Sequence, residues 1–454
     1  MAAKTPTLLH SPAPLAGAAL DAALDADPVE KGELHNGLRV VTVALPHLRA
    51  GMLAAYVRAG SRHEDERRNG VSHFLEHLFF RGSEGHPEGR ALNALVEDEG
   101  GNLNGVTTRD HGYYYTPVHP QRLEVPFEVL GDMLARPLFK EIELEREVIL
   151  EEILDEVDEE GRDIDIDNLS KRELFSEHPL ALKIGGTRET VKQLTEQDFR
   201  DQHARAYGAR NLVLCCAGPV SHAQVMDLAH RAFGKLPPGA PLTDSPLVPY
   251  LRGPQLICVD HHESQTELRL SFPTPAEHHD DFTALLLLRR VLDDGLAARL
   301  QLAVVERKGL AYAVHAGIDT FSDCGVFEIE GACAPKKAPA FAQELLKLLA
   351  ELCDEDVSAE ELNRAKVRHR IGLEFALDST GEMIGWFGGT ELFRPAEGFA
   401  ARAVRVEAAT AADLKRVARK TFRREALVAC AVGPMAGVEK KLRAIVDEAA
   451  GLPR

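Results

Sequence analysis

The sequence lacks the long apolar runs, repeats and biased tracts that mark membrane, fibrous or disordered chains. In 454 residues, no apolar run reaches the roughly 18 residues that a membrane-spanning helix needs. Hydrophobic residues make up 44% and charged residues 27%, which is typical of a globular protein and excludes collagen, coiled coil or disorder as the main architecture. At about 150 residues per domain, the length predicts two to four domains.

Basic residues are scarce relative to acidic ones. There are 53 Lys and Arg against 71 Asp and Glu, and the net charge is −18. A chain of this charge repels nucleic acid and anionic membranes, so we expect neither as a partner. The same charge favours basic peptides.

Cysteine pairing and a secretory signal are also missing. The seven cysteines are odd in number and form no C-x-x-C, which predicts reduced core cysteines. Within residues 1–28, Asp21, Asp25 and Asp27 interrupt the apolar stretch that a signal peptide requires. We therefore predict a flexible N-terminal arm at 1–28 and a cytoplasmic location, with the periplasm or an organelle left open.

Two parts of the chain resemble each other at a constant offset. Thr195 and Asp198 precede an apolar run that ends at Gly218, and Thr410 and Asp413 precede another that ends at Gly433. Every pair is 215 residues apart. Thr-x-x-Asp is typical of the capping turn that starts a helix. The spacing indicates a duplicated half of about 215 residues, although two common helix–strand units could also coincide by chance.

A proline-rich segment separates the two halves. Residues 237–254 contain six prolines, which fix an extended connection. We predict an N-terminal domain at 29–236, a linker at 237–254 and a homologous C-terminal domain at 255–454. Each half begins with strands and then adds helices. The predicted fold class is therefore α+β, with two lobes, each a mostly antiparallel sheet covered by helices, enclosing a cleft or chamber.

The sharpest local pattern is His73-Phe-Leu-Glu76-His77. On a helix, positions i and i+4 share one face, so both imidazoles can reach one metal ion. Glu76 lies beside that face, where a carboxylate can take a proton from metal-bound water. A chance H-x-x-E-H is the alternative at this point.

A third ligand can be sought in the acidic segment that follows. Glu145 and Glu152 are two helical turns apart and share a face. However, residues 141–160 contain eleven Asp or Glu, and a charge run is usually a solvated face. The residues alone therefore leave the choice among these glutamates open.

Taken together, H-x-x-E-H and the later Glu145-Arg-Glu-Val-Ile-Leu-Glu-Glu152 resemble the inverzincin metallopeptidases, the family of pitrilysin, insulin-degrading enzyme and mitochondrial processing peptidase. Gly100-Gly-Asn-Leu-Asn104 resembles the family's glycine-rich entry to an edge strand. Gly309-Leu-Ala-Tyr312 resembles its G-L-A-Y segment. The likeness spans roughly residues 30–440, and the length is similar to the shorter, processing-peptidase-like members.

The resemblance implies a role for each of these residues. His73, His77 and Glu152 would bind one Zn²⁺ per chain, and Glu76 would be the general base. Glu145 would orient a ligand imidazole without binding the metal, and Tyr312 would donate to the oxyanion. Asn104 would bind a peptide added to the sheet edge. The implied function is a zinc endopeptidase that cleaves peptides or unfolded segments by attack of a metal-bound water.

One position departs from the family pattern. The family usually has an Arg seven residues before the Tyr, and here that position is Val305, with Arg307 two residues later. We therefore expect a homodimer, or a heterodimer in which a homologous subunit supplies the missing Arg function, unless Arg307 substitutes. The alternative function is a non-catalytic or partner-dependent chamber subunit of a processing-peptidase-like complex.

Overall fold

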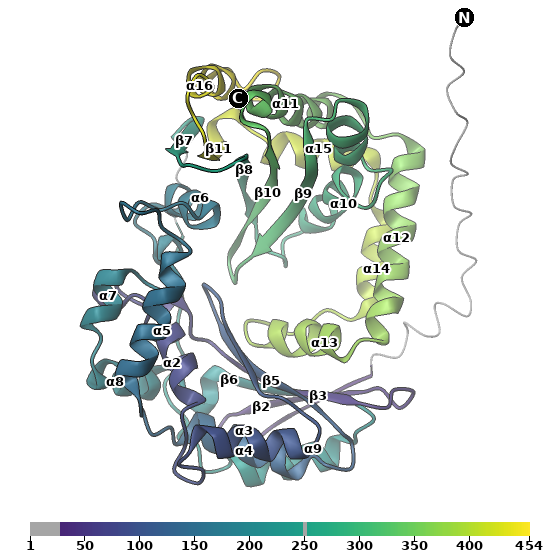
Figure 1. The fold of residues 1–454 in the computed structure, drawn as a ribbon. Coiled ribbons are helices and arrows are strands. Elements are labelled where there is room, and N and C mark those ends of the chain that lie inside the picture. Colours follow the sequence, from purple (N-terminus) through teal and green to yellow (C-terminus); the bar gives the residue numbers. More distant parts are fainter. Residues whose placement is uncertain (1–27, 248–251) are drawn as a thin grey trace, which may run out of the picture. The chain divides into compact units, whose positions relative to one another are not determined.

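The computed structural model describes residues 28–247 and 252–454 of the chain (Figure 1). These residues form two compact units. The N-terminal unit contains residues 28–247 together with Phe375–Glu397, and the C-terminal unit contains residues 252–374 together with Gly398–Arg454. The predicted arm lies outside the described residues except for Pro28, as does the part of the predicted linker at 248–251. Within the described ranges, no helix is long and apolar enough to span a bilayer.

The N-terminal unit is built on a sheet with the strand order β1-β2-β6-β3-β5-β4. Its neighbours pair antiparallel except for the parallel pair β2–β6. β6 is buried along its whole length, as expected for an apolar strand in the middle of a sheet. The strands are β1 (Val29–Glu33), β2 (Arg39–Ala44), β3 (Gly51–Val57), β4 (Asn104–Thr107), β5 (Gly112–Val118) and β6 (Leu212–Gly218).

Helices of the N-terminal unit cover one face of this sheet (Figure 1). Their buried aromatic side chains, among them Phe74, Phe79, Phe127 and Phe199, form the core between helices and sheet. The longer helices are α2 (Val71–Phe79), α3 (Gly89–Asp98), α4 (Glu124–Ala135), α5 (Ile142–Leu154), α6 (Ile166–Phe175), α7 (Arg188–Gln193), α8 (Glu196–Ala206) and α9 (His222–Phe233).

The C-terminal unit has its own sheet, in the order β7-β11-β8-β10-β9, with a parallel pair β7–β11. Its strands are β7 (Gln255–Asp260), β8 (Thr266–Pro275), β9 (Ala311–Thr320), β10 (Cys324–Cys333) and β11 (Val428–Gly433). The helices include α10 (Phe282–Leu292), α11 (Ala338–Asp354), α12 (Ala359–Leu377), α14 (Phe399–Ala408), α15 (Ala411–Thr421) and α16 (Glu439–Glu448).

The two sheets repeat one topology. The order β2-β6-β3-β5-β4 corresponds strand by strand to β7-β11-β8-β10-β9, with the parallel pair in the same place. Capping boxes at Thr195 and Thr410 start α8 and α15, and the strands that follow both end at a glycine with positive φ, Gly218 and Gly433. The predicted class, α+β with mostly antiparallel sheets covered by helices, is confirmed.

One segment departs from the predicted domain boundaries. Residues Phe375–Glu397, called the strap here, were expected in the C-terminal domain but belong to the N-terminal unit. The strap contains α13 (Thr380–Met383) and the π-helical turn η7 (Ile384–Gly389), and η7 lies against β2, β3 and β6. Arg39 donates to the carbonyl oxygens of Glu391 and Leu392. The physical reason is burial, because the strap covers the sheet face that the other helices leave open.

Candidate metal centre

Helix α2 carries the two histidines of the motif, and a buried carboxylate caps its first turn. Gly70 precedes the helix with φ of +95°, and a Cβ there would lie 2.7 Å from the carbonyl oxygen of Gly185. The carboxylate of Glu64 accepts 2.8 Å hydrogen bonds from the backbone N–H groups of Gly70 and Ser72. Burial raises the pKa of Glu64, and these hydrogen bonds oppose the rise. Glu64 was not predicted from the sequence, although a carboxylate before a helix is a recognised capping signal.

Packing of the apolar side of α2 turns both histidines away from the core. Phe74, Leu75, Leu78 and Phe79 are fully buried. The imidazole rings of His73 and His77 lie on the other side, with centroids 4.8 Å apart. Burial and the neighbouring His77 lower the pKa of His73 to about 4. His73 is therefore neutral near pH 7, the form in which imidazole binds a metal.

Glu152 of α5 completes a group of three. Its Oε2 lies 3.8 Å from His73 Nε2 and 3.7 Å from His77 Nε2. The three candidate ligand atoms all lie within 4.8 Å of one another. The structure therefore brings together the three side chains that the resemblance implied as ligands.

The donor set fits zinc. Bonds of about 2.0–2.1 Å in a tetrahedral arrangement would place ligand atoms about 3.4 Å apart, close to the observed 3.7 and 3.8 Å. His77 Nδ1 lies 2.9 Å from Glu145 Oε2. Because this N–H donates to the carboxylate, Nε2 is the nitrogen left for a metal. Two imidazoles and one carboxylate are the ligand set of a catalytic zinc that keeps one position open.

Helix α5 presents Glu145 and Glu152 two turns apart along the edge of its buried side. Ile149 and Ile153 are buried, and Glu145 is only 2% exposed. Arg146 lies over the ring of Phe74 from α2 and donates to the carbonyl oxygen of Leu194. The predicted solvated face is therefore only part of this helix, since Glu145 faces inward.

Glu76 lies beside the three candidate ligands, against the edge strand β4. Thr107 Oγ1 donates a 2.5 Å hydrogen bond to Glu76 Oε2. A Cβ at Gly105 would lie 2.7 Å from Glu76 Cγ, so only glycine lets the strand approach this closely. Burial raises the pKa of Glu76, while the Thr107 hydrogen bond opposes the rise. Glu76 was predicted from the sequence, but its hydrogen bond with Thr107 was not.

The remaining predicted residues occupy two different strands at sheet edges. Asn104 begins β4, at the end of the strand order, and its Nδ2 donates to the carbonyl oxygen of Asn102. Tyr312 is 91% exposed on β9 of the C-terminal unit, so its role toward a substrate oxygen stays a prediction. Val305 packs against the core of that unit, and Arg307 is exposed.

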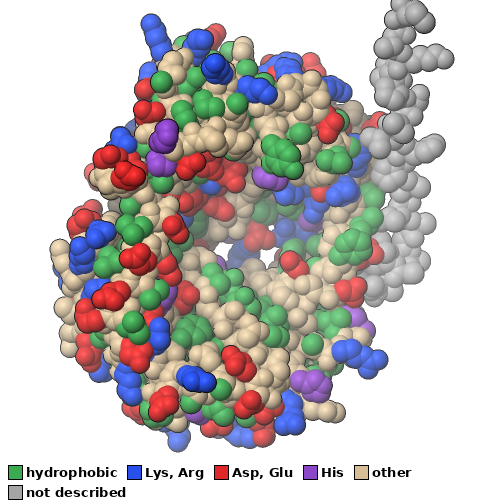
Figure 2. Space-filling model, viewed as in Figure 1, with side chains coloured by type: hydrophobic (Ala, Val, Ile, Leu, Met, Phe, Trp, Pro, Cys, Tyr) green, Lys and Arg blue, Asp and Glu red, His purple; other side chains and the backbone are tan. Residues whose placement is uncertain are grey.

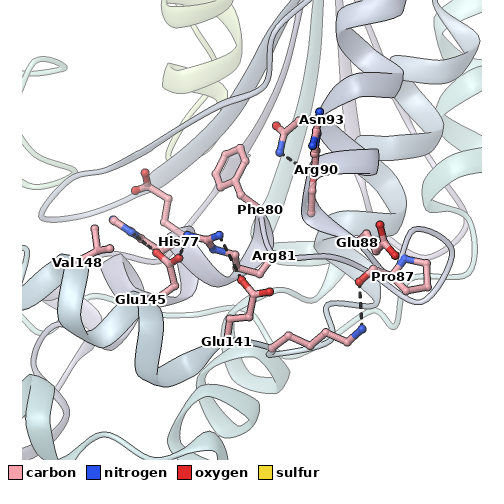
Figure 3. A pocket seen from close by; sticks show the side chains of 13 residues that line it. His77, Phe80, Arg81, Pro87, Glu88, Arg90, Asn93, Glu141, Glu145 and Val148 are labelled. Atoms are coloured by element: carbon pink, nitrogen blue, oxygen red, sulfur yellow. Dashed lines mark hydrogen bonds and ion pairs between the residues drawn. The ribbon is translucent and has the colours of Figure 1, made fainter.

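A cavity of about 820 Å³ opens beside His77 and Glu76 (Figure 3). Phe80, Pro87 and Val148 give it apolar walls, and charged side chains from α3 and the start of α5 surround them. Figure 3 shows Arg81 reaching Glu141 and Glu145 on one side of this cavity. The cavity is large enough for a peptide side chain next to the candidate metal position.

Comparisons with known proteins identify the family. Residues 39–188 match the model described as Insulinase (Peptidase family M16), and residues 193–368 match the model described as Peptidase M16 inactive domain. An uncharacterized zinc protease of Mycobacterium leprae is 30% identical over 364 residues, which cover 79% of this chain and 81% of the relative. The chain belongs to peptidase family M16.

Other M16 relatives agree with this assignment. A probable mitochondrial-processing peptidase subunit beta of Arabidopsis thaliana is 28% identical over 88% of this chain and 78% of its own length. A protease from Helicobacter pylori shares the fold with a TM-score of 0.82 and 23% identity, over 89% of this chain and 99% of its own. The resemblance noted in the sequence is thereby confirmed, and all three candidate ligands fall within the residues matched by the first M16 model.

Proposed function

We propose that this M16 chain is a zinc-dependent endopeptidase. The observation that carries the proposal is the convergence of His73, His77 and Glu152 at 3.7–3.8 Å, with Glu76 beside them. One zinc per chain, held by these side chains, would supply the Lewis acid that polarises a peptide carbonyl and acidifies the attacking water.

The residues around this position have separate tasks in the proposed reaction. Glu76 takes the proton of the attacking water and later passes it to the leaving amine. Thr107 occupies one oxygen of that carboxylate and so directs the other oxygen toward the water. Glu145 holds the imidazole of His77 in the tautomer that frees Nε2.

The substrate is proposed to bind as an added strand. β4 is at the end of the sheet order, and Glu76 contacts Thr107 in the same strand. A peptide paired with this edge would therefore run past the proposed metal position, with Asn104 at one end. Main-chain pairing reads extended conformation more than sequence, which suits peptides and unfolded segments.

A preference for basic substrates is part of the proposal. The net charge is −18, and acidic side chains gather over the α5 region of the face seen in Figure 2. Positively charged peptides would be attracted to such a surface, and the preference should weaken as salt is added.

The substitution Glu76→Gln tests the catalytic role. The amide keeps the size of the side chain but cannot accept the proton, so we expect zinc content to remain near one per chain. Hydrolysis of an internally quenched peptide should fall by about 10²-fold or more. Glu147→Gln, the same change at an exposed position of α5, is the matched control and should retain both properties. Full activity of the Glu76→Gln protein would remove Glu76 from its role.

A second candidate function is a partner-dependent or non-catalytic subunit. It is favoured by Val305, which packs into the core at the position where the resemblance leads us to expect an Arg. A relative is itself named as a subunit beta. Zinc binding without cleavage by the purified chain, and cleavage by the complex isolated from cells, would support this function. Cleavage by the purified chain alone would exclude it.

A further inference from the structure

Glu145 is a buried carboxylate whose two oxygens have different partners. Oε2 accepts from His77 Nδ1, and Oε1 forms an ion pair with Arg81 Nη2. Glu145 is 2% exposed, whereas the Arg81 side chain is 34% exposed. A buried charge is tolerated when it is paired, and removal of one partner leaves it uncompensated. Arg81 is therefore the outer end of a chain of contacts that leads through Glu145 to a candidate zinc ligand.

Arg81 also contacts a second residue of α5. Its Nη1 lies 3.3 Å from Glu141 Oε2, and Glu141 is the residue that precedes α5. Glu141 and Glu145 are four residues apart, so one guanidinium spans the first turn of the helix. Arg81 itself lies just beyond Phe80, the residue that caps the C-terminus of α2. It therefore connects the end of the helix that carries the histidines with the beginning of the helix that carries Glu152.

This double contact has a geometric consequence for the metal position. The terminal torsion of a glutamate is broad, so a single hydrogen bond does not fix the orientation of its carboxylate. The guanidinium of Arg81 holds Glu145 Oε1, which leaves Oε2 directed at His77 (Figure 3). Through Glu141 and Glu145, the same guanidinium holds the first turn of α5 beside the end of α2. Glu152 lies two turns further along α5, on the same face as Glu145.

We propose that Arg81 is a positioning residue of the metal centre, which sets zinc affinity through Glu145 without binding the ion. The proposal rests on the proposed function, because it presumes that His73, His77 and Glu152 hold zinc. It concerns a different observation, namely the ion pairs of Arg81 with two glutamates of α5.

The test is the zinc affinity of the full-length metal-free protein, measured by competition with a chromophoric chelator. Loss of a residue that orients a metal ligand typically costs about 10- to 100-fold in metal affinity, and Arg81 acts one contact further out. We therefore expect Arg81→Gln to weaken zinc binding by about tenfold. Arg81→Lys keeps the charge but lacks the fork that reaches both carboxylates, so its affinity should lie between those of Arg81→Gln and the wild type.

The direction of the change separates positioning from simple electrostatics. Removing a positive charge near a bound cation should by itself strengthen zinc binding. Arg90→Gln is the matched control, because Arg90 is exposed on α3 and lines the same cavity. Weaker binding by Arg81→Gln together with equal or tighter binding by Arg90→Gln supports the proposal. Equal affinity of Arg81→Gln and wild type overturns it.

A double-mutant cycle tests whether the effect passes through Glu145. In a Glu145→Gln background, Arg81→Gln should change zinc affinity little further, since both side chains act in one chain of contacts. Additive losses would overturn the proposed route. If Arg81→Gln does not fold, as judged by circular dichroism of the metal-free protein, Arg81→Lys decides alone, and wild-type affinity in that variant overturns the proposal. Failure of the wild-type chain to bind zinc would instead refute the proposed function.

Discussion

Single residues of this chain show two ways of burying an ionisable group. Glu64 and Glu145 are buried with hydrogen-bond or ion-pair partners that stabilise the carboxylate. His369 on α12 is 5% exposed, and neither of its ring nitrogens has a hydrogen-bond partner among the described residues. Without a partner, a buried imidazole stays neutral, because burial disfavours its protonated form in the folded state.

His369 should make the C-terminal unit sensitive to mild acid. Burial, and then the charges of Arg290 and Arg402, lower its pKa to about 3, with Asp294 opposing them. In the unfolded chain the pKa returns to about 6.5. As pH falls below about 6.5, the unfolded state therefore binds a proton that the folded state refuses. The contribution of neutral His369 to the free energy of unfolding is fully present above that pH. It falls by up to about 1.4 kcal/mol per pH unit down to about pH 3.

The substitution His369→Leu removes this titration. The free energy of unfolding, followed by urea titration and far-UV circular dichroism, should fall less steeply between pH 6.5 and 4 than in the wild type. Above pH 7 the two proteins should show parallel pH dependence, whatever their difference in absolute stability. Identical slopes below pH 6.5 would contradict this account of His369.

Local spacing predicted only part of the candidate site, and the choice of Glu152 among the acidic residues came from the family resemblance. His73 and His77 share a helix face because they are four apart, and Glu145 and Glu152 do so because they are seven apart. The partner Thr107 could not be found in this way, because its contact with Glu76 joins a helix to a strand 31 residues away. Such contacts depend on packing, which leaves no local pattern.

At the scale of elements, the strap is the feature that ties distant parts of the chain together. Its turn η7 lies against the middle strands of the N-terminal sheet, and Phe393 beyond it contacts His111 and Arg58. Gly388 is packed so closely that a Cβ would lie 2.5 Å from Cys215 Cβ and 2.9 Å from a ring carbon of Tyr56. The absence of a side chain at 388 is therefore what lets η7 reach the sheet.

The substitution Gly388→Ala should destabilise the N-terminal unit. A methyl group forced into this contact costs about 1–3 kcal/mol, as for other overpacked positions. Gly385→Ala is a matched control in the same turn, because a Cβ there meets no atom within 4 Å. Urea unfolding can be followed through Trp386, the only tryptophan in the chain, which also lies in η7. If Gly388→Ala and Gly385→Ala unfold at the same urea midpoint, the neighbours of residue 388 can move to accommodate a methyl group, which would contradict the prediction.

The elements themselves were largely predictable, but the membership of the strap was not. Capping signals predicted the helix starts at Thr195 and Thr410. Nothing in residues 375–397 indicates that they pack on strands more than 150 residues earlier. Arg39 and Glu391 are 352 residues apart, and neither residue type predicts the other.

At the scale of the whole molecule, the two sheets share a topology but differ in the residues that their units carry. The candidate ligands lie on α2 and α5 of the N-terminal unit. The strap places a late part of the sequence, including Trp386, in that same unit. A metal bound by His73, His77 and Glu152 should therefore stabilise a structure that Trp386 reports, although these residues are far apart in sequence.

Removal of zinc should lower the melting temperature reported by Trp386 fluorescence. A ligand that binds only the folded state adds about 4 kcal/mol when its free concentration is a thousand times its Kd. We therefore expect the Trp386 transition to fall on chelation and to return when zinc is added back. Glu152→Gln, which removes one candidate ligand from an exposed position on α5, should abolish the difference between the two conditions.

Equal melting temperatures with and without zinc in the wild type would contradict the prediction. They would mean either that the three side chains do not bind the ion or that the strap unfolds independently of them. Zinc titration of the same samples separates these two causes, because only the first leaves the protein without bound metal.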